Sequence, residues 1–286
     1  MNSLIQQFLN HLKNEKSRTQ ETINNYYFYL DRFLNWSKIK SPEEITVTLT
    51  KKYRLWLAKQ MSGRYLLDKS TQNYYLIALR SFVRYLNEIN KCNFDPKNIF
   101  LEKTERKNIN HLDLEEIESL MRTPLNTQES HIVQLRDRAI LELLFCAGLK
   151  VSELAALKKT DINLNQDEFL IQGKFGRPRA CLLSNQAKFA LKNYLNFRRD
   201  KIPYLFIRHD HAKNLNESGH LTPRSLQRAI SYYGKLAGIK KKVTPQTLRH
   251  TFTYLMFNEG AELEQVQKLL GHTSLNSTHR YQRLNN

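Results

Sequence analysis

The sequence is poor in residues that break regular structure or crosslink a small fold. Its 286 residues include 9 glycines and 7 prolines, which excludes collagen-like and low-complexity chains. Its three cysteines, Cys92, Cys146 and Cys181, are odd in number and far apart, so neither a disulfide framework nor a structural zinc site is expected. There is no apolar run of about 18 residues and no signal-peptide core. We therefore expect a cytoplasmic protein that does not enter a membrane.

Positive charge is what the chain has in excess. It carries 45 Lys and Arg against 27 Asp and Glu, a formal net charge of +18. Both halves, divided at residue 104, share this surplus, so it is not a basic tail. A polyanion is the commonest partner for such a surplus, and both halves are basic enough to face a phosphate backbone. Charge alone also fits a role in solubility, because net charge describes association rather than fold.

Apolar residues at helical spacing run through the first hundred residues. Thr19 is a typical N-cap for a helix that follows it. Residues 70–88 predict a second long helix with one apolar stripe. The stripe consists of Tyr74, Ile77, Ala78, Phe82 and Tyr85. With helices near residues 5–12 and 51–60, the pattern predicts a small helical domain over residues 1–104.

The next segment changes character. Residues 91–110 are polar and aperiodic, which suits a linker. Asp113-Leu-Glu-Glu116 then predicts a capped helix start. An apolar helix over residues 134–147 is expected to end at Gly148, a typical C-cap. Further helices are expected near residues 185–198, 223–237, 245–258 and 263–270.

One hairpin interrupts these helices. Strand-like runs at residues 169–171 and 180–183 flank Gly173-Lys-Phe-Gly176, which predicts a turn between two strands. The expected fold is mainly α with a small antiparallel sheet (α+β), in two domains over residues 1–104 and 105–286.

Four short segments in the second half carry residue types suited to phosphate chemistry. They are Ala147-Gly-Leu-Lys-Val-Ser-Glu-Leu154, Gly173-Lys-Phe-Gly-Arg-Pro-Arg179, Thr244-Pro-Gln-Thr-Leu-Arg-His-Thr-Phe252 and Leu270-Gly-His-Thr-Ser-Leu-Asn-Ser-Thr-His-Arg-Tyr281. In this order and at these separations they resemble the tyrosine site-specific recombinase (phage integrase) family, most closely its Xer-type branch. The resemblance covers nearly the whole chain and implies a helical, SAM-like core-binding domain before a catalytic domain. Together these would form a C-shaped clamp around duplex DNA.

The resemblance implies DNA recombination by strand cleavage and rejoining without a cofactor. Tyr281 would be the nucleophile, leaving a 3′-phosphotyrosine that keeps the energy of the phosphate bond. Arg249 would clamp the scissile phosphate, where negative charge grows in the transition state. Lys174, at the hairpin tip, would protonate the departing 5′-oxygen, and His272 would donate a hydrogen bond to the phosphate.

Two positions depart from the family pattern. The family's first arginine falls at Lys150, which keeps the charge but cannot fork two bonds onto a phosphate. The histidine three residues before the second arginine falls at Gln246, whose amide cannot shuttle a proton. Glu153 would orient the base at position 150, and His250 would buttress the pocket. The alternatives are an impaired or inactive DNA-binding relative, and an unrelated basic scaffold that binds RNA or protein.

Two basic segments are expected to contact DNA. They contribute Lys240, Lys241 and Lys242 from one loop, and Arg177 and Arg179 from the hairpin. The implied partner is duplex DNA with paired sites, held by a homo- or heterotetramer. Xer-type relatives carry a further helix where residues 282–286 stand, so assembly through such a helix is not expected.

Another short motif contains metal-ligand residue types. His209-Asp-His211 has no third partner nearby in sequence, which favours a solvated turn over a metal site. The residues leave the target DNA open, and with it the choice among dimer resolution, integration and inversion.

Overall fold

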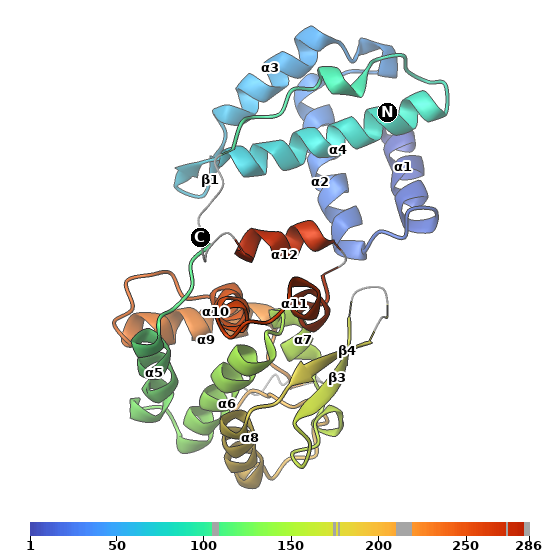
Figure 1. The fold of residues 1–286 in the computed structure, drawn as a ribbon. Coiled ribbons are helices and arrows are strands. Elements are labelled where there is room, and N and C mark those ends of the chain that lie inside the picture. Colours follow the sequence, from blue (N-terminus) through green and yellow to red (C-terminus); the bar gives the residue numbers. More distant parts are fainter. Residues whose placement is uncertain (105–108, 174–175, 177, 210–218, 273, 283–286) are drawn as a thin grey trace. The chain divides into compact units, whose positions relative to one another are not determined.

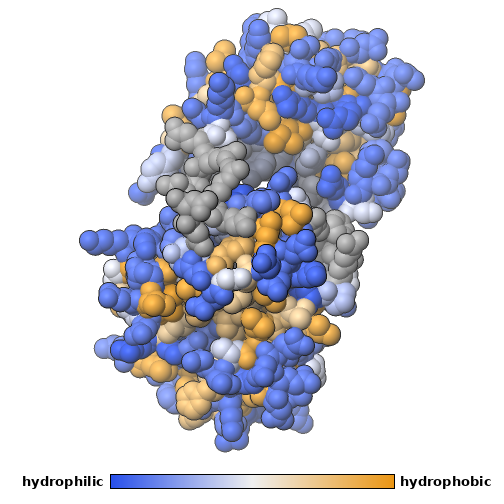
Figure 2. All heavy atoms as spheres, viewed as in Figure 1, coloured by the Kyte–Doolittle hydropathy of each residue, from blue (hydrophilic) through white to orange (hydrophobic). Residues whose placement is uncertain are grey.

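The computed structural model describes residues 1–104, 109–173, 176, 178–209, 219–272 and 274–282. The chain divides into two compact units, residues 1–107 and 108–286, drawn as ribbons in Figure 1. Each unit has an apolar core of its own. No helix within the described ranges has the length and apolar character needed to cross a membrane. Figure 2 shows hydrophilic side chains over most of the visible surface, with hydrophobic patches among them.

The first unit is built from helices. Over residues 1–104 they are α1 (Asn2–Asn14), α2 (Gln20–Ser37), α3 (Val47–Ala58) and α4 (Lys69–Glu88). The Thr19 side chain accepts a hydrogen bond from the backbone of Thr22, which confirms the predicted cap of α2. Between α3 and α4 lies a small antiparallel pair, β1 (Met61–Ser62) and β2 (Tyr65–Leu66).

Aromatic rings fill the core of this unit. The Tyr53 ring is fully buried, 4.9 Å from the ring of Phe33 and 5.8 Å from that of Trp56. The predicted stripe of α4 is wrong at two positions, because Tyr74 and Ile77 are 56% and 39% exposed. Four apolar residues in succession, 74–77, leave the helical phase undetermined from sequence alone. Packing against α2 and α3 fixes it by burying the two central ones.

Residues 91–102 belong to the first unit, so the predicted linker is wrong over this stretch. Cys92 and Ile99 are buried in the core. The Arg80 side chain donates to the carbonyl oxygen of Ile99 at 2.7 Å. The Asn73 amide pairs with both backbone groups of Glu102, at 2.8 and 2.9 Å. Isolated apolar anchors and side-chain bonds from α4 hold the segment, and neither produces a periodic sequence pattern.

The second unit combines helices with one hairpin. The helices are α5 (Leu114–Arg122), α6 (His131–Ala147), α7 (Val151–Ala156), α8 (Asn185–Phe197), α9 (Pro223–Leu236), α10 (Pro245–Asn258), α11 (Leu263–Leu270) and α12 (Leu275–Gln282). Strands β3 (Glu168–Gln172) and β4 (Pro178–Leu182) pair antiparallel, so the predicted hairpin is confirmed. The fold is mostly helical, which confirms the predicted class, and it has two small antiparallel sheets where one was predicted.

Both predicted helix signals in this unit are confirmed. Asp113 and Glu116 form a reciprocal capping box at the start of α5, with hydrogen bonds of 2.9 and 3.0 Å. α6 ends at Gly148, which adopts a left-handed conformation with φ +54°. A Cβ atom there would lie 2.6 Å from the Phe252 ring, so the position requires glycine on both counts.

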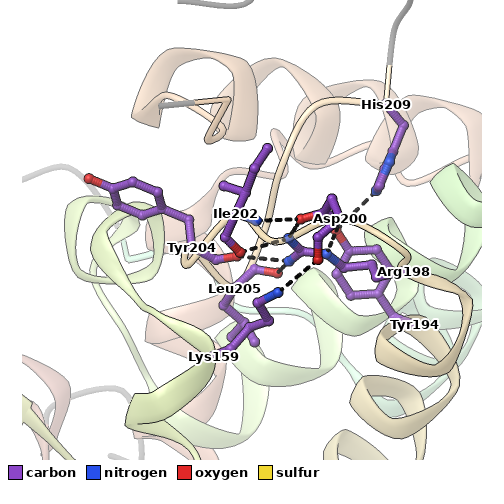
Figure 3. A network of polar contacts seen from close by, with 8 residues as sticks. All are labelled: Lys159, Tyr194, Arg198, Asp200, Ile202, Tyr204, Leu205 and His209. Atoms are coloured by element: carbon purple, nitrogen blue, oxygen red, sulfur yellow. Dashed lines mark hydrogen bonds and ion pairs between the residues drawn. The ribbon is translucent and has the colours of Figure 1, made fainter. Parts of the chain in front are cut away.

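A polar network lies beyond the end of α8 (Figure 3). The buried guanidinium of Arg198 donates to the carbonyl oxygens of Tyr204 and Leu205, both at 2.7 Å. The Tyr194 hydroxyl and Nε2 of His209 are 3.0 Å apart. His209 therefore has a phenol partner, and no group of three or more metal-binding side chains occurs among the described residues. Residues 210 and 211 lie outside them.

Candidate active site

Arg249 lies at the centre of the candidate site. It is 2% exposed on α10, which begins after the N-cap Thr244. Its guanidinium donates to the carbonyl oxygen of Gly148 at 2.6 Å and to that of Leu270 at 2.5 Å. These oxygens lie at the ends of α6 and α11, both followed by left-handed glycines. Arg249 therefore joins three of the sequence motifs at one point.

Burial and a second arginine act on this guanidinium. Burial and the nearby positive charge of Arg179 lower the pKa of Arg249, and the carboxylate of Glu153 opposes them. An arginine still keeps its proton under such conditions. The site thus holds a permanent positive charge in a largely dry environment, where electrostatic interactions are stronger than in water.

Tyr281 lies beside this charge. It is carried by α12 and is 5% exposed. Its ring centroid is 5.3 Å from that of His250 and 6.3 Å from that of His272. Burial raises the pKa of Tyr281 above its ordinary value, while Arg249, Arg280 and a hydrogen bond with Gln246 act in the opposite direction. The phenol is therefore protonated at neutral pH and must lose its proton to become a nucleophile.

His272 links Arg249 to the helix of Tyr281. Its Nε2 is 3.3 Å from a guanidinium nitrogen of Arg249, and its Nδ1 is 3.0 Å from the Thr278 hydroxyl. Burial, then the charges of Arg249, Lys150 and Arg179, lower the pKa of His272 to about 4. The imidazole is neutral at physiological pH.

Gln246 and His250 form a pair one helical turn apart on α10. Their Nε2 atoms are 2.8 Å apart. The Gln246 amide nitrogen only donates, so Nε2 of His250 accepts. Burial lowers the pKa of His250, and a hydrogen bond to the backbone of Asn110 opposes this shift. The predicted supporting histidine therefore lies in the site as a neutral group.

Lys150 and Glu153 lie at the start of α7. The Glu153 carboxylate accepts from the backbone N–H of Lys150 at 2.8 Å, and its other oxygen is 3.5 Å from the Lys150 ammonium. The Lys150 side chain is 40% exposed. The Lys150 ammonium therefore lies at the site and remains accessible to a ligand.

Arg179 corrects one prediction. Its side chain is 5% exposed and pairs with Glu153 at 2.8 Å. It also donates to the carbonyl oxygen of Leu269. A guanidinium enclosed in this way does not face DNA, so the predicted DNA contact is wrong. The other hairpin predictions, Lys174 and Arg177, lie outside the described residues.

The lysine loop after α9 divides into different roles. Lys240, Lys241 and Lys242 are all exposed. The ammonium of Lys241, however, is 2.6 Å from the Glu116 carboxylate and 3.6 Å from that of Asp113. It pairs with the acidic start of α5, a partner that was not predicted from the sequence. Lys242 instead lines a cavity next to Lys150.

That cavity, of about 540 Å³, is the feature that the sequence pattern missed. It is lined by Leu149, Lys150, Val151, Arg224, Gln227, Arg228, Ser231, Lys242, Thr244, Pro245 and Gln246. None of these lining residues is acidic, and four are Lys or Arg. One face of α9 supplies Arg224, Gln227, Arg228 and Ser231. Their three- and four-residue spacing was a readable signal of a polar helical face.

Family comparisons cover both units. A model described as "Phage integrase family" matches residues 110–286. A second, "Phage integrase, N-terminal SAM-like domain", matches residues 5–89. Tyrosine recombinase XerC of Thermodesulfovibrio yellowstonii is 32% identical over 97% of this chain and 90% of its own length. Tyrosine recombinase XerD of Listeria monocytogenes is 32% identical over 98% and 94%.

Solved structures share the fold. The XerH site-specific recombinase, in a post-cleavage complex with a palindromic difH substrate, matches with a TM-score of 0.76 at 23% identity, over 99% of this chain and 82% of that one. A lambda integrase dimer bound to a core site matches with a TM-score of 0.72 at 15% identity, over 98% and 94%. These identities are low, and the likeness is one of architecture.

Proposed function

This chain belongs to the phage integrase family of tyrosine recombinases, enzymes that break and rejoin DNA, and on that premise we propose that it recombines specific sites through a covalent bond to Tyr281. One observation carries the proposal. Two of the motifs, residues 244–252 and 270–281, bring the Tyr281 phenol, the Arg249 guanidinium and the His272 imidazole to one place. These groups supply the nucleophile and the charge stabilisation for in-line attack on a phosphodiester.

The reaction exchanges one phosphorus–oxygen bond for another. The Tyr281 oxygen bonds to phosphorus and loses its proton, and the bond to the 5′-oxygen breaks. That oxygen leaves with a proton, which the family resemblance assigns to Lys174. Arg249 neutralises the charge that gathers on the non-bridging oxygens. Rejoining is the same exchange in reverse, with a 5′-hydroxyl as the attacking group.

The groups around Tyr281 influence how its proton is lost. The Gln246 amide contacts both the phenol and His250. It stabilises a forming phenolate by hydrogen bonding but accepts no proton. Arg249 lies close enough to favour the phenolate electrostatically. We infer that solvent takes the proton and that this step is slower than it would be with a histidine at position 246.

The alternative function is a DNA-binding relative that cleaves slowly or not at all. Lys150 favours it, because an ammonium 3.5 Å from Glu153 makes point contacts rather than a forked pair. Gln246 favours it for the lack of a proton acceptor. Both alternatives share the same DNA-binding surface.

The proposed partner is duplex DNA with paired sites. Each copy of the chain would hold the duplex with its two domains, and the copies would assemble on it as a tetramer. The solved XerH and lambda integrase structures are complexes with recombination-site DNA, the latter as a dimer. The cavity beside Lys150 supports the proposal, because its four cations lie next to the candidate site. Phosphate contacts by such side chains position the duplex, and base contacts by α9 would specify its sequence.

The test is a covalent selection that also identifies the target sequence. The full chain is incubated with a library of randomised duplexes, each carrying a nick that lets the cleaved fragment diffuse away. Protein-linked DNA is then recovered under denaturing conditions and amplified. We expect wild type to enrich one family of sequences and Tyr281→Phe to enrich none. Equal recovery from both proteins would rule out the recombinase proposal.

A combined variant separates the two candidate functions. Lys150→Arg with Gln246→His restores the family residues at both positions. If wild type yields no adduct while this variant does, the chain is a binding relative with an intact frame. If wild type already yields the adduct, the enzyme function holds.

A further inference from the structure

A buried hydroxyl lies against the candidate site without taking part in the proposed bond exchange. Thr278 is on α12, three residues before Tyr281, and is fully buried. Its oxygen is 3.0 Å from Nδ1 of His272. Two other buried threonines behave differently, since Thr251 and Thr253 donate to carbonyl oxygens four residues earlier on α10, at 2.9 and 2.7 Å. That is the ordinary arrangement for threonine inside a helix.

The second nitrogen of His272 determines where the ring proton lies. Nε2 is 3.3 Å from a guanidinium nitrogen of Arg249. Arginine offers donors only, so Nε2 accepts that hydrogen bond. A neutral imidazole has one ring proton, and it must then be on Nδ1, where it is donated to Thr278. The two contacts together define a single tautomer.

We propose that Thr278 is a positioning residue whose hydroxyl accepts the Nδ1 proton that the Arg249 contact leaves on His272 and thereby fixes the orientation of the ring, and this inference rests on the proposed recombinase function. A hydroxyl both donates and accepts, so it can hold either tautomer. When a phosphate binds Arg249, His272 needs a proton on Nε2 to donate to it. The ring then gives the Nδ1 proton to water and takes one from water at Nε2, and Thr278 turns from acceptor to donor. The ring stays in place throughout.

The placement of Thr278 also ties His272 to the nucleophile. His272 follows α11, whereas Thr278 and Tyr281 are one turn apart on α12. The hydrogen bond therefore joins the two segments that carry reacting groups. Removing it leaves a buried nitrogen without a partner, and the ring is free to change tautomer.

Two substitutions and one control isolate the hydroxyl. Thr278→Val keeps the branched shape and removes the hydroxyl, whereas Thr278→Ser keeps the hydroxyl. Ser277→Ala removes the hydroxyl of the adjacent exposed residue. Thermal unfolding of each full-length variant establishes that it is folded before any comparison.

The first measurement needs no DNA. Histidines are labelled with ¹⁵N, and the His272 signals are assigned by their loss in His272→Gln. We expect wild type, Thr278→Ser and Ser277→Ala to have the proton on Nδ1 at neutral pH, and Thr278→Val to shift it toward Nε2. A wild-type ring protonated on Nε2 would overturn the proposal without any variant. An unchanged tautomer in folded Thr278→Val would also overturn it.

The second measurement uses the nicked duplex recovered by the covalent selection. At saturating duplex, we expect Thr278→Val to form adduct about 10- to 100-fold more slowly. Loss of a partner that orients a functional histidine typically costs about this much in activity. Thr278→Ser and Ser277→Ala should stay close to wild type, and duplex affinity should be unchanged in all three. A Thr278→Val rate equal to wild type would overturn the positioning role. If wild type itself forms no adduct, the recombinase proposal fails, and the tautomer measurement still decides the role of Thr278.

Discussion

Gln246 donates a hydrogen bond from its side-chain amide to Nε2 of His250 across 2.8 Å. A residue that cannot act as a proton acceptor in catalysis is thereby linked to one that can. The His250 ring lies beside Tyr281, with centroids 5.3 Å apart. The amide fills the space where the family has a histidine and preserves a hydrogen bond there. It does not supply a proton acceptor to the phenol.

Gln246→His should therefore speed cleavage. General acid–base help is typically worth about 10²- to 10⁴-fold, and we expect a gain of at least about 10-fold in single-turnover adduct formation. Gln246→Ala should be slower than wild type, because the phenol loses its hydrogen bond. A Gln246→His rate at or below wild type would show that the amide is not the limiting feature.

Lys150→Arg should also raise the rate. The Lys150 ammonium is at the site but makes single contacts, and a guanidinium can place two parallel bonds on a phosphate. We expect roughly a 10-fold gain, the equivalent of about 1.4 kcal/mol of transition-state stabilisation. The exposed Lys158→Arg is the matched control and should leave the rate unchanged. If Lys158→Arg raised the rate equally, the gain would not depend on position 150, and the proposed forked contact there would be contradicted.

Arg249→Lys should damage both cleavage and stability. Loss of one preorganised donor at a developing oxyanion costs about 10²- to 10³-fold in rate. A lysine cannot satisfy the carbonyls of Gly148 and Leu270 as the guanidinium does, and a buried unpaired polar group costs about 1–3 kcal/mol. Urea unfolding and adduct kinetics measure the two effects. The exposed Arg199→Lys should change neither, and a fully stable Arg249→Lys would contradict the structural role.

These residues show which features the sequence could predict. Caps at Thr19 and Asp113, the C-cap at Gly148 and the hairpin all follow from local chemistry that the structure preserves. The ordered motifs were enough to predict the family. Local rules are sufficient where a residue's partner lies in the same turn, cap or hairpin.

The errors concern contacts that depend on the tertiary fold. Arginine is a residue type that commonly faces DNA. The Arg179 side chain instead packs against Gly271, which has no side chain and so leaves room for it. Lys241 finds its partner, Glu116, 125 residues away. Thr278 is one hydroxyl among many until α11 and α12 are placed together. The placement of one element against another, and not residue type, decides these contacts.

Stability should fall as the pH drops below about 6.5. Burial, then neighbouring positive charges, lower the pKa of His272 to about 4, and burial with Arg136 and Arg198 lowers that of His209 to about 4. The unfolded chain takes up these protons near pH 6.5 and the folded chain only near 4. Unfolding is therefore favoured progressively between these values. Urea midpoints across this window measure the loss, which His209→Gln should reduce, and a midpoint that rises on acidification would contradict the assignment.

Duplex binding should distinguish two exposed cations. Arg228 lines the basic cavity, whereas the Lys241 ammonium is paired with Glu116. With a short duplex of arbitrary sequence, Arg228→Ala should weaken binding and reduce the salt slope by about 1. Lys241→Ala should leave both nearly unchanged. If Lys241→Ala weakened binding more than Arg228→Ala, the result would place the DNA contact on the lysine loop and contradict the prediction.

Peptide mapping of the covalent adduct tests the identity of the nucleophile most directly. Wild type is reacted with the selected nicked duplex, digested with nuclease and protease, and analysed by tandem mass spectrometry. The proposal predicts a single nucleotide-bearing peptide with the phosphate on Tyr281, and its absence from Tyr281→Phe. A phosphate on any other residue, or an adduct that persists in Tyr281→Phe, would contradict it.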